Sequence, residues 1–210
     1  QAFPFACNIG FLGSRTPEYQ VNSLCAGKCP PGQLCPTPAT IEPIPCVRGK
    51  YCPEGSAEAI NCPPGTHSNA TDLASATQCQ ATDPGFFGPS GSTYPTPCAA
   101  GTYTDRQGQG VCFQCEPGKH QPMLGQTTCI ECRGGTRCPT GASVELLCEA
   151  GTHQPERGQS QCIACTAGHA CPAGSINQTA CSSGSFGDLA AWTCKLCAPG
   201  EYQPNGTRTS

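Results

Sequence analysis

Large apolar residues are sparse along the chain. Leu, Ile, Val and Phe together make up 27 of the 210 residues, about 13%. A chain with so few large apolar side chains cannot bury enough surface to offset its conformational entropy, so on this ground alone it would be disordered. No stretch is long and apolar enough to span a bilayer. The pattern predicts short β-hairpins and turns with almost no helix, held together by something other than a hydrophobic core.

Disulfides between cysteines can stabilise a chain that lacks a hydrophobic core. The chain has 21 cysteines, a content typical of a disulfide scaffold. Disulfides persist in oxidising compartments, so the protein is predicted to be secreted or at the cell surface. The expected fold class is small and disulfide-rich, an elongated tandem array of short β-hairpin and turn modules.

In six loops a cysteine is followed three residues later by glycine, and two residues beyond each of these glycines stands a ring. The pairs are Cys62/Gly65, Cys98/Gly101, Cys115/Gly118, Cys148/Gly151, Cys181/Gly184 and Cys197/Gly200, and the rings are His67, Tyr103, His120, His153, Phe186 and Tyr202. A position shared by His, Tyr and Phe requires a flat side chain, not a metal ligand or a catalytic base. We interpret the rings as packing groups that lie over disulfides, with glycine turning the chain at a positive φ. His169 lies outside this register.

The spacing of cysteines divides the chain into repeats. A second element, C-x5-C-P, lies between several loops and lengthens the repeat to 33 residues, as from Cys132 to Cys165. Periods of this size indicate a linear array in which each unit contacts its neighbours. The expected organisation is an N-terminal aromatic arm and Pro-rich cap segment (1–45), a cysteine-rich repeat (46–81), a degenerate repeat without cysteines (82–97), two short cysteine-rich loops (98–131), two further repeats (132–164 and 165–196) and a truncated repeat (197–210).

The degenerate repeat bears on the disulfide pairing. Thr82 stands where an opening cysteine is expected, and the closing position, Thr96, is also threonine. The absence of both cysteines from one loop is expected if the two would bond each other, so it favours bonding between successive cysteines. The predicted bridges are Cys7–Cys25, Cys29–Cys35, Cys46–Cys52, Cys62–Cys79, Cys98–Cys112, Cys115–Cys129, Cys132–Cys138, Cys148–Cys162, Cys165–Cys171 and Cys181–Cys194. An interlocked pattern, such as Cys132–Cys148 with Cys138–Cys162, stays open. Cys197 is unpaired within these residues, and we expect the natural chain to continue past Ser210 with a cysteine.

The run "CAAGTYTDRQGQGVCFQCEPGKHQPMLGQTTCIEC" (98–132) resembles the ephrin-receptor-like cysteine-rich repeat, C-x2-G-x-[aromatic]…G…C-x2-C. Small loops of similar kind open the repeats of tumour-necrosis-factor receptors. The resemblance covers residues 46–210 and implies tandem disulfide modules. It does not fix a function, because such repeats occur in receptors, in protist coat proteins and in filament or matrix proteins.

Catalytic and metal-binding chemistry finds little support. The CxxC pairs at Cys112/Cys115 and Cys129/Cys132 approach a zinc-ribbon spacing, but the same spacing runs head to tail, so each pair would serve two sites. No βαβ pattern accompanies a redox motif, and neither a G-x-S-x-G nor an H-E-x-x-H motif occurs. With a net charge of −3 and 11 Lys and Arg, no basic patch favours nucleic acid. We expect a non-enzyme with no metal site and no cofactor.

The remaining signals concern the surface. Asn69, Asn177 and Asn205 begin N-glycosylation sequons. Phe3, Phe5 and Phe11 either cap the chain's own first module or form an apolar arm for self-association into a polymer. Residues 36–45, "PTPATIEPIP", form a stiff extended spacer or an ordinary Pro-rich loop.

The leading hypothesis is a non-catalytic extracellular structural glycoprotein, a subunit of a filament, appendage or surface coat. The alternatives are a ligand-binding receptor ectodomain and a protist surface antigen.

Overall fold

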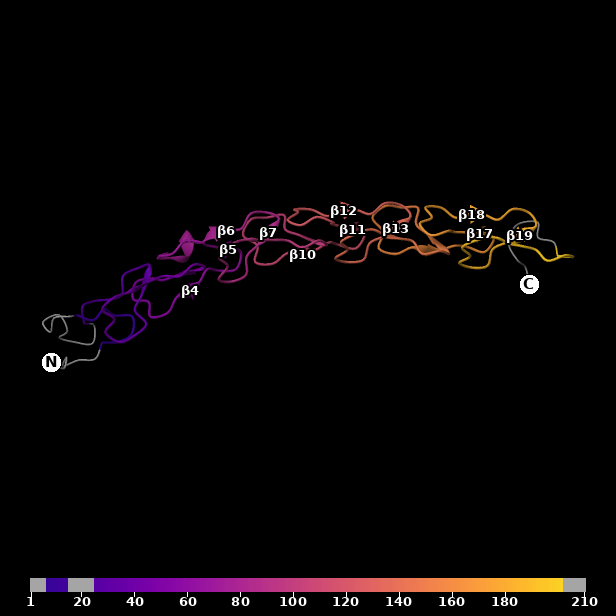
Figure 1. The fold of residues 1–210 in the computed structure, drawn as a ribbon. Helices are drawn as coiled ribbons and strands as arrows, with labels where there is room; N and C mark the ends of the chain where they lie inside the picture. The colour runs from indigo at the N-terminus through magenta and orange to yellow at the C-terminus, as the bar shows by residue number, and fades with distance from the viewer. Residues whose placement is uncertain (1–6, 15–24, 202–210) are drawn as a thin grey trace. The chain divides into compact units, whose positions relative to one another are not determined.

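The fold consists of short antiparallel hairpins, one after another along the chain (Figure 1). The computed structural model describes residues 7–14 and 25–201. Contacts divide the chain into two compact units, residues 1–98 with 104–112, and residues 99–103 with 113–210. The expected class, small disulfide-rich hairpin modules in tandem, is confirmed. Within the described residues the only helical element is the 3-10 helix η2, Ala76–Gln78.

Each hairpin pairs two strands of two residues. The first strands are β1 (Gln33–Leu34), β3 (Lys50–Tyr51), β5 (Thr66–His67), β7 (Phe86–Phe87), β9 (Thr102–Tyr103), β11 (Lys119–His120), β13 (Thr136–Arg137), β15 (Thr152–His153), β17 (His169–Ala170) and β19 (Ser185–Phe186). Their partners are β2 (Ile44–Pro45), β4 (Ile60–Asn61), β6 (Gln80–Ala81), β8 (Thr96–Pro97), β10 (Phe113–Gln114), β12 (Ile130–Glu131), β14 (Leu146–Leu147), β16 (Ile163–Ala164), β18 (Thr179–Ala180) and β20 (Lys195–Leu196).

One local plan underlies every hairpin, including the C-x5-C-P elements. The opening cysteine, or Thr82, is followed three residues later by glycine and then by the first strand. The N–H of Gly118 donates to the carbonyl of Cys138 in the next hairpin (2.8 Å), and the N–H of Cys132 donates to the carbonyl of Gly118 (3.0 Å). The structural repeat is therefore a single hairpin of about half the 33-residue period, because both cysteine patterns build the same backbone unit.

Contacts also reach the hairpin after the next one. Gly118 has a φ of 85°, and a Cβ there would overlap the carbonyl of Gly158; Gly101 stands in the same relation to Gly141. Close backbone approach of this kind admits only glycine. The packing is wider than the nearest-neighbour contacts expected from the repeat, since hairpins such as that of Gly118 touch the two that follow them.

Disulfides take the place of a hydrophobic core. The structure pairs the cysteines sequentially in ten bridges, from Cys7–Cys25 to Cys181–Cys194. Nine consecutive opening positions, from Cys29 to Cys165 and including Thr82, are fully buried. Each opening cysteine bonds either the residue six positions on, as in Cys132–Cys138, or the residue just before the second strand, as in Cys115–Cys129. In the hairpins that open with cysteine, the buried disulfide thus occupies the centre, whether the second cysteine is the near or the far one.

The degenerate repeat belongs to the short class of hairpin, which corrects the assignment of Thr96 as its closing position. Thr96 lies in β8, where it pairs with Phe87. The residue six positions after Thr82 is Gly88, followed by Pro89 just as Pro139 follows Cys138. A Cβ on Gly88 would lie 3.1 Å from Cγ2 of Thr82. Positions 82 and 88 are therefore equivalent to the two cysteine positions of a short hairpin.

The Pro-rich segment 36–45 is a loop, not an extended spacer. Its last two residues form β2 and pair with β1. Thr40 is buried, and its carbonyl accepts the N–H of Gly13 at 2.9 Å. The segment is thus integrated into the first hairpin because its backbone groups are paired there.

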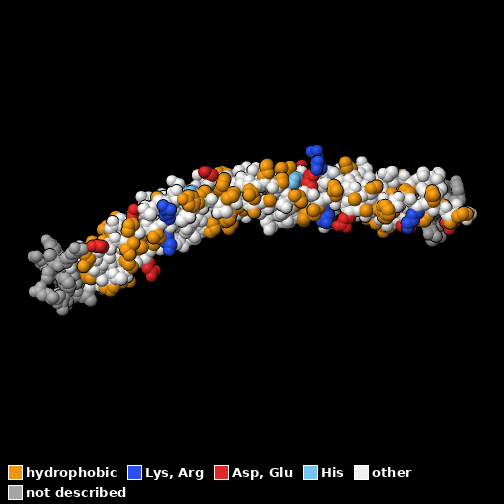
Figure 2. All heavy atoms as spheres, viewed as in Figure 1, with side chains coloured by type: hydrophobic (Ala, Val, Ile, Leu, Met, Phe, Trp, Pro, Cys, Tyr) orange, Lys and Arg blue, Asp and Glu red, His pale blue; other side chains and the backbone are white. Residues whose placement is uncertain are grey.

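Large apolar side chains remain at the surface, and charged groups are few (Figure 2). Tyr103 and Phe113 contact each other across the β9–β10 pair, with ring centroids 6.3 Å apart. Trp192 is 63% exposed. No helix in the described part of the chain is long and apolar enough to cross a membrane.

Candidate functional site

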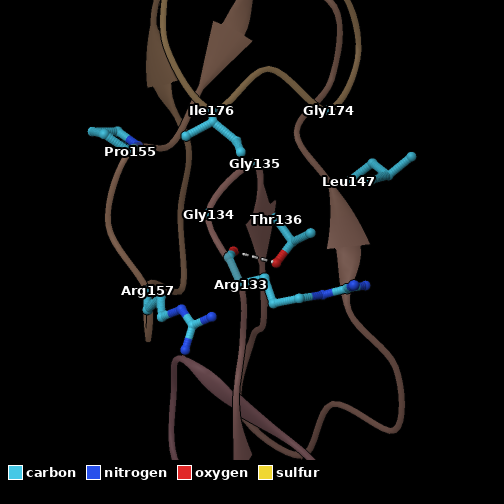
Figure 3. A pocket seen from close by; sticks show the side chains of 9 residues that line it. All are labelled: Arg133, Gly134, Gly135, Thr136, Leu147, Pro155, Arg157, Gly174 and Ile176. Atoms are coloured by element: carbon cyan, nitrogen blue, oxygen red, sulfur yellow. Dashed lines mark hydrogen bonds between the residues drawn. The ribbon is translucent and has the colours of Figure 1, made fainter.

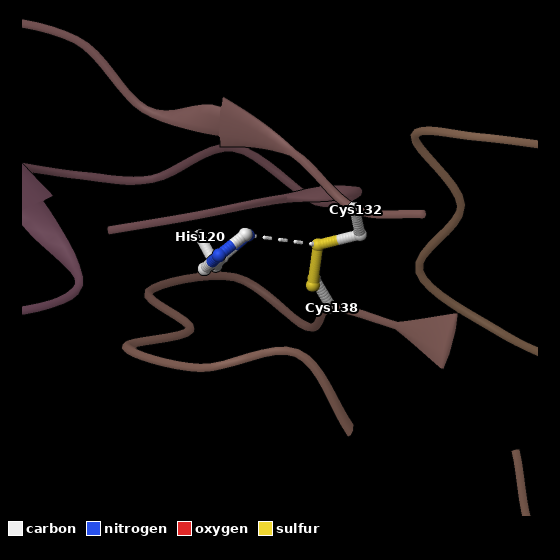
Figure 4. A group of neighbouring side chains, drawn as sticks. All are labelled: His120, Cys132 and Cys138. Atoms are coloured by element: carbon white, nitrogen blue, oxygen red, sulfur yellow. Dashed lines mark hydrogen bonds between the residues drawn. A yellow bond between two sulfur atoms is a disulfide. The ribbon is translucent and has the colours of Figure 1, made fainter. Parts of the chain in front are cut away.

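Two histidines of the repeat, His120 and His153, lie beside the disulfide of the following hairpin. His120, the second residue of β11, places Nδ1 3.4 Å from Sγ of Cys132, which is bonded to Cys138 (Figure 4). The ring therefore covers the next bridge and not its own, Cys115–Cys129. This placement joins neighbouring hairpins through a packed side chain, as expected for a ring chosen for its shape.

The same arrangement recurs one repeat later. Ligand atoms of His153, Cys165 and Cys171 lie within 4.8 Å of one another, as do those of His120, Cys132 and Cys138. In both groups the two sulfurs are joined in a disulfide, whereas metals bind the thiolate. Each group then offers a single imidazole nitrogen, and this donor set does not fit zinc.

The other rings occupy equivalent strand positions. His67, Tyr103 and Phe186 are half-buried second residues of their strands, and Tyr202 lies outside the described residues. His169 is the first residue of β17, and its Nδ1 lies 3.0 Å from Oγ1 of Thr166. Among the described residues, the side chains of His67, Tyr103 and His169 make no hydrogen bond to a carboxylate.

The CxxC pairs join successive bridges. Cys112 bonds Cys98 while Cys115 bonds Cys129, so the two sulfurs of "CFQC" belong to different hairpins. Cys197 is unbonded and half-buried. A dithiol–disulfide switch within one CxxC motif has no counterpart in this pairing.

Two predicted surface sites are accessible. Asn69 and Asn177 are exposed, as glycan attachment requires, and Asn205 lies outside the described residues. Phe3 and Phe5 lie outside them as well. Phe11 is half-buried, and its backbone forms an isolated antiparallel β-bridge with Lys28, which places it against its own chain.

Two glutamine side chains hold the long loops together through hydrogen bonds to the loop backbone. Gln121 is 2% exposed; its Nε2 donates to the carbonyl of Thr128 at 2.7 Å, and its Oε1 accepts the N–H of Met123 at 3.0 Å. Gln154 repeats these bonds with the Gln161 carbonyl and the Glu156 N–H. Both residues stand six positions after the opening cysteine, where the short hairpins carry their second cysteine. The repeated "HQP" sequence is thus explained by structure.

A surface hollow in the second unit was not indicated by the sequence motifs. It has a volume of about 520 Å³ and is lined by Arg133, Gly134, Leu147, Pro155, Arg157 and Ile176, among others (Figure 3). It lies at the turn before β13, where the chain reads "CRGG" (132–135). Oγ1 of Thr136 donates to the Arg133 carbonyl at 2.7 Å and fixes this turn.

One of its two arginines is already neutralised. The Nε of Arg133 donates to Oε2 of Glu145 at 2.8 Å, and its backbone N–H donates to Oε1 at 2.9 Å. Hydrogen bonds from Arg133 hold the pKa of Glu145 below its usual value, and this carboxylate raises the pKa of Arg133 in turn. Arg157 has no ion pair among the described residues.

Comparison with known proteins adds no family to this description. No family model matches the chain, and no curated protein matches it either.

Proposed function

We propose that the protein is a non-catalytic extracellular structural glycoprotein, a subunit of a filament, appendage or surface coat. The observation that carries the proposal is a backbone contact, repeated in several hairpins, of one hairpin with the two that follow it, as Gly118 shows with Cys138 and Gly158. Such contacts fix the geometry of each unit without a large core, and a rigid repeated unit is suited to building an extended assembly.

The chemistry of the chain supports an extracellular setting. Ten disulfides indicate an oxidising environment. The exposed sequons at Asn69 and Asn177 suit attached glycans. The resemblance of residues 46–210 to ephrin-receptor-like repeats agrees with a surface or secreted protein and leaves the partner undefined.

We assign self-association to the N-terminal aromatic residues Phe3 and Phe5. Phe11 is less suited to a contact between subunits, because it is half-buried against its own chain beside Lys28. The matched test compares Phe3→Ser/Phe5→Ser with Tyr94→Ser, a substitution at an aromatic residue that is 58% exposed elsewhere in the first unit.

The deciding experiment is electron microscopy of the protein from its native source under non-reducing conditions, with sedimentation of the same sample across a range of concentrations. Ordered fibres or sheets, lost in Phe3→Ser/Phe5→Ser and kept in Tyr94→Ser, are the expected result. A species that stays monomeric at every concentration would overturn the polymer and favour a receptor ectodomain or surface antigen.

A further inference from the structure

We propose that the hollow at the turn before β13 binds a carboxylate flanked by apolar side chains on a partner polypeptide. This inference concerns recognition of another protein and does not depend on polymer formation. It is carried by the shape of the hollow, by its walls and by its charge, three features that arise from different residues (Figure 3).

The turn at the hollow differs in sequence from the turns of the other hairpins. The residue just before the turn glycine is Pro in several hairpins and Ala100, Ala150 and Ala167 in others, but it is Gly134 here. A Cβ at this position would lie 3.3 Å from the carbonyl oxygens of Gln154 and Pro155, and 3.4 Å from Cγ2 of Ile176. Glycine at this position therefore lets the Gln154–Pro155 backbone and Ile176 pack closely against the turn, where Pro155 and Ile176 form part of the wall of the hollow.

The walls of the hollow are apolar and accessible. Leu147 is 65% exposed and Ile176 is 52% exposed, and both contribute to the lining together with Pro155. Burying these side chains beneath a partner would remove apolar surface from water and favour binding.

The charge of the hollow selects an anion. Glu145 neutralises Arg133, whereas Arg157 presents its guanidinium without an ion pair among the described residues. A smaller hollow of about 260 Å³ nearby shows the contrast, because its arginine, Arg137, lies 3.5 Å from Glu149. A guanidinium can donate two parallel hydrogen bonds to a carboxylate, whose oxygens accept them.

A protein ligand fits this combination better than a polyanion. Nucleic acid and sulfated polysaccharide gain their affinity from several cations acting together, whereas this hollow has one uncompensated cation and three apolar walls in a chain of net charge −3. An acidic residue between apolar ones matches both components.

The test uses the full chain, methyl-labelled for NMR, and the capped tripeptide acetyl-leucyl-aspartyl-leucinamide. Saturable shifts of the Leu147 and Ile176 methyl groups are expected with a dissociation constant of about 1 mM. The asparaginyl analogue, which differs only in the charge, should bind about tenfold more weakly or not at all.

Two variants and a matched control locate the site. Arg157→Gln should weaken binding to the level of the asparaginyl analogue, and Gly134→Ala should weaken it because the new Cβ would displace the closely packed Pro155 and Ile176 wall. Arg48→Gln, an exposed arginine in the first unit, should leave binding unchanged. Equal binding of the two peptides, full binding by Arg157→Gln, or no saturable shift would each overturn the proposal. Tighter Arg157-dependent binding of a heparin disaccharide would also overturn it, by assigning the site to a polyanion.

Discussion

Because Thr82 and Gly88 occupy the cysteine positions of a short hairpin, an eleventh disulfide can be predicted between them. The four short bridges join residues six positions apart, with Cα–Cα distances of 5.8, 5.9, 6.3 and 6.2 Å. Thr82 and Gly88 occupy the same positions, and Gly88 is not among the residues of positive φ. We therefore expect the double variant Thr82→Cys/Gly88→Cys to form a disulfide spontaneously on oxidative folding.

The expected magnitude follows from chain entropy. Closing a loop of about seven residues in the unfolded chain should stabilise the folded hairpin by roughly 2 kcal/mol. Two effects act on this value. Replacing glycine reduces unfolded-state entropy and adds up to about 1 kcal/mol, whereas the new Cβ would lie 3.0 Å from the Thr66 carbonyl, which must shift slightly. A gain of about 2 kcal/mol corresponds to about 30-fold slower opening exchange.

The assay is hydrogen exchange of the Gly85 and Cys98 amides, which are bonded to Thr104 and Gly85 within the same unit, after peptide mapping of the new bridge by mass spectrometry. The control is Thr82→Ser/Gly88→Ser, which makes nearly the same change in volume without a bond. Free thiols at both positions in an otherwise bridged protein would refute the equivalence of 82 and 88 with the short pairs. A bridge that speeds exchange relative to the serine control would refute the stated magnitude.

Three further predictions test the packing. Gly118→Ala should destabilise its hairpin more than Gly184→Ala, because both have a positive φ but only Gly118 would overlap a carbonyl, that of Gly158; limited proteolysis that cuts both variants equally would contradict this. Gln121→Ala should cost about 1–3 kcal/mol by removing both hydrogen bonds of a buried side chain, seen as faster exchange of the Met123 amide, whereas Gln126→Ala, at a half-buried glutamine that bonds the Leu124 carbonyl, should not change it. For Glu145 the pKa is lowered by folding, so its contribution is present above the unfolded-state pKa near 4.3 and is lost as pH falls through the folded-state value. Acid titration followed by the Arg133 amide shift should show this loss, and Glu145→Gln should abolish the transition; an identical titration in the variant would exclude Glu145 as its source.

Much of the local structure could be read from the sequence because it depends on residues close together in the chain. The Cys-x2-Gly turn, the ring two residues later and the successive bridges lie within a single hairpin, so their spacing is visible as a repeat. The opening cysteine of each C-x5-C-P element is also followed three residues later by glycine, as Cys132 is by Gly135. This signal was present and would have shown one uniform repeat.

The relations between hairpins could be decided only by the tertiary structure. That His120 covers the bridge Cys132–Cys138, and that Gly118 approaches Gly158, depends on how successive hairpins stack. The hollow is of the same kind, because its lining comes from several hairpins and Gly134 lets two of them approach its turn closely. Sequence spacing fixes bonds within a hairpin, whereas these contacts depend on backbone directions that only the packed fold establishes.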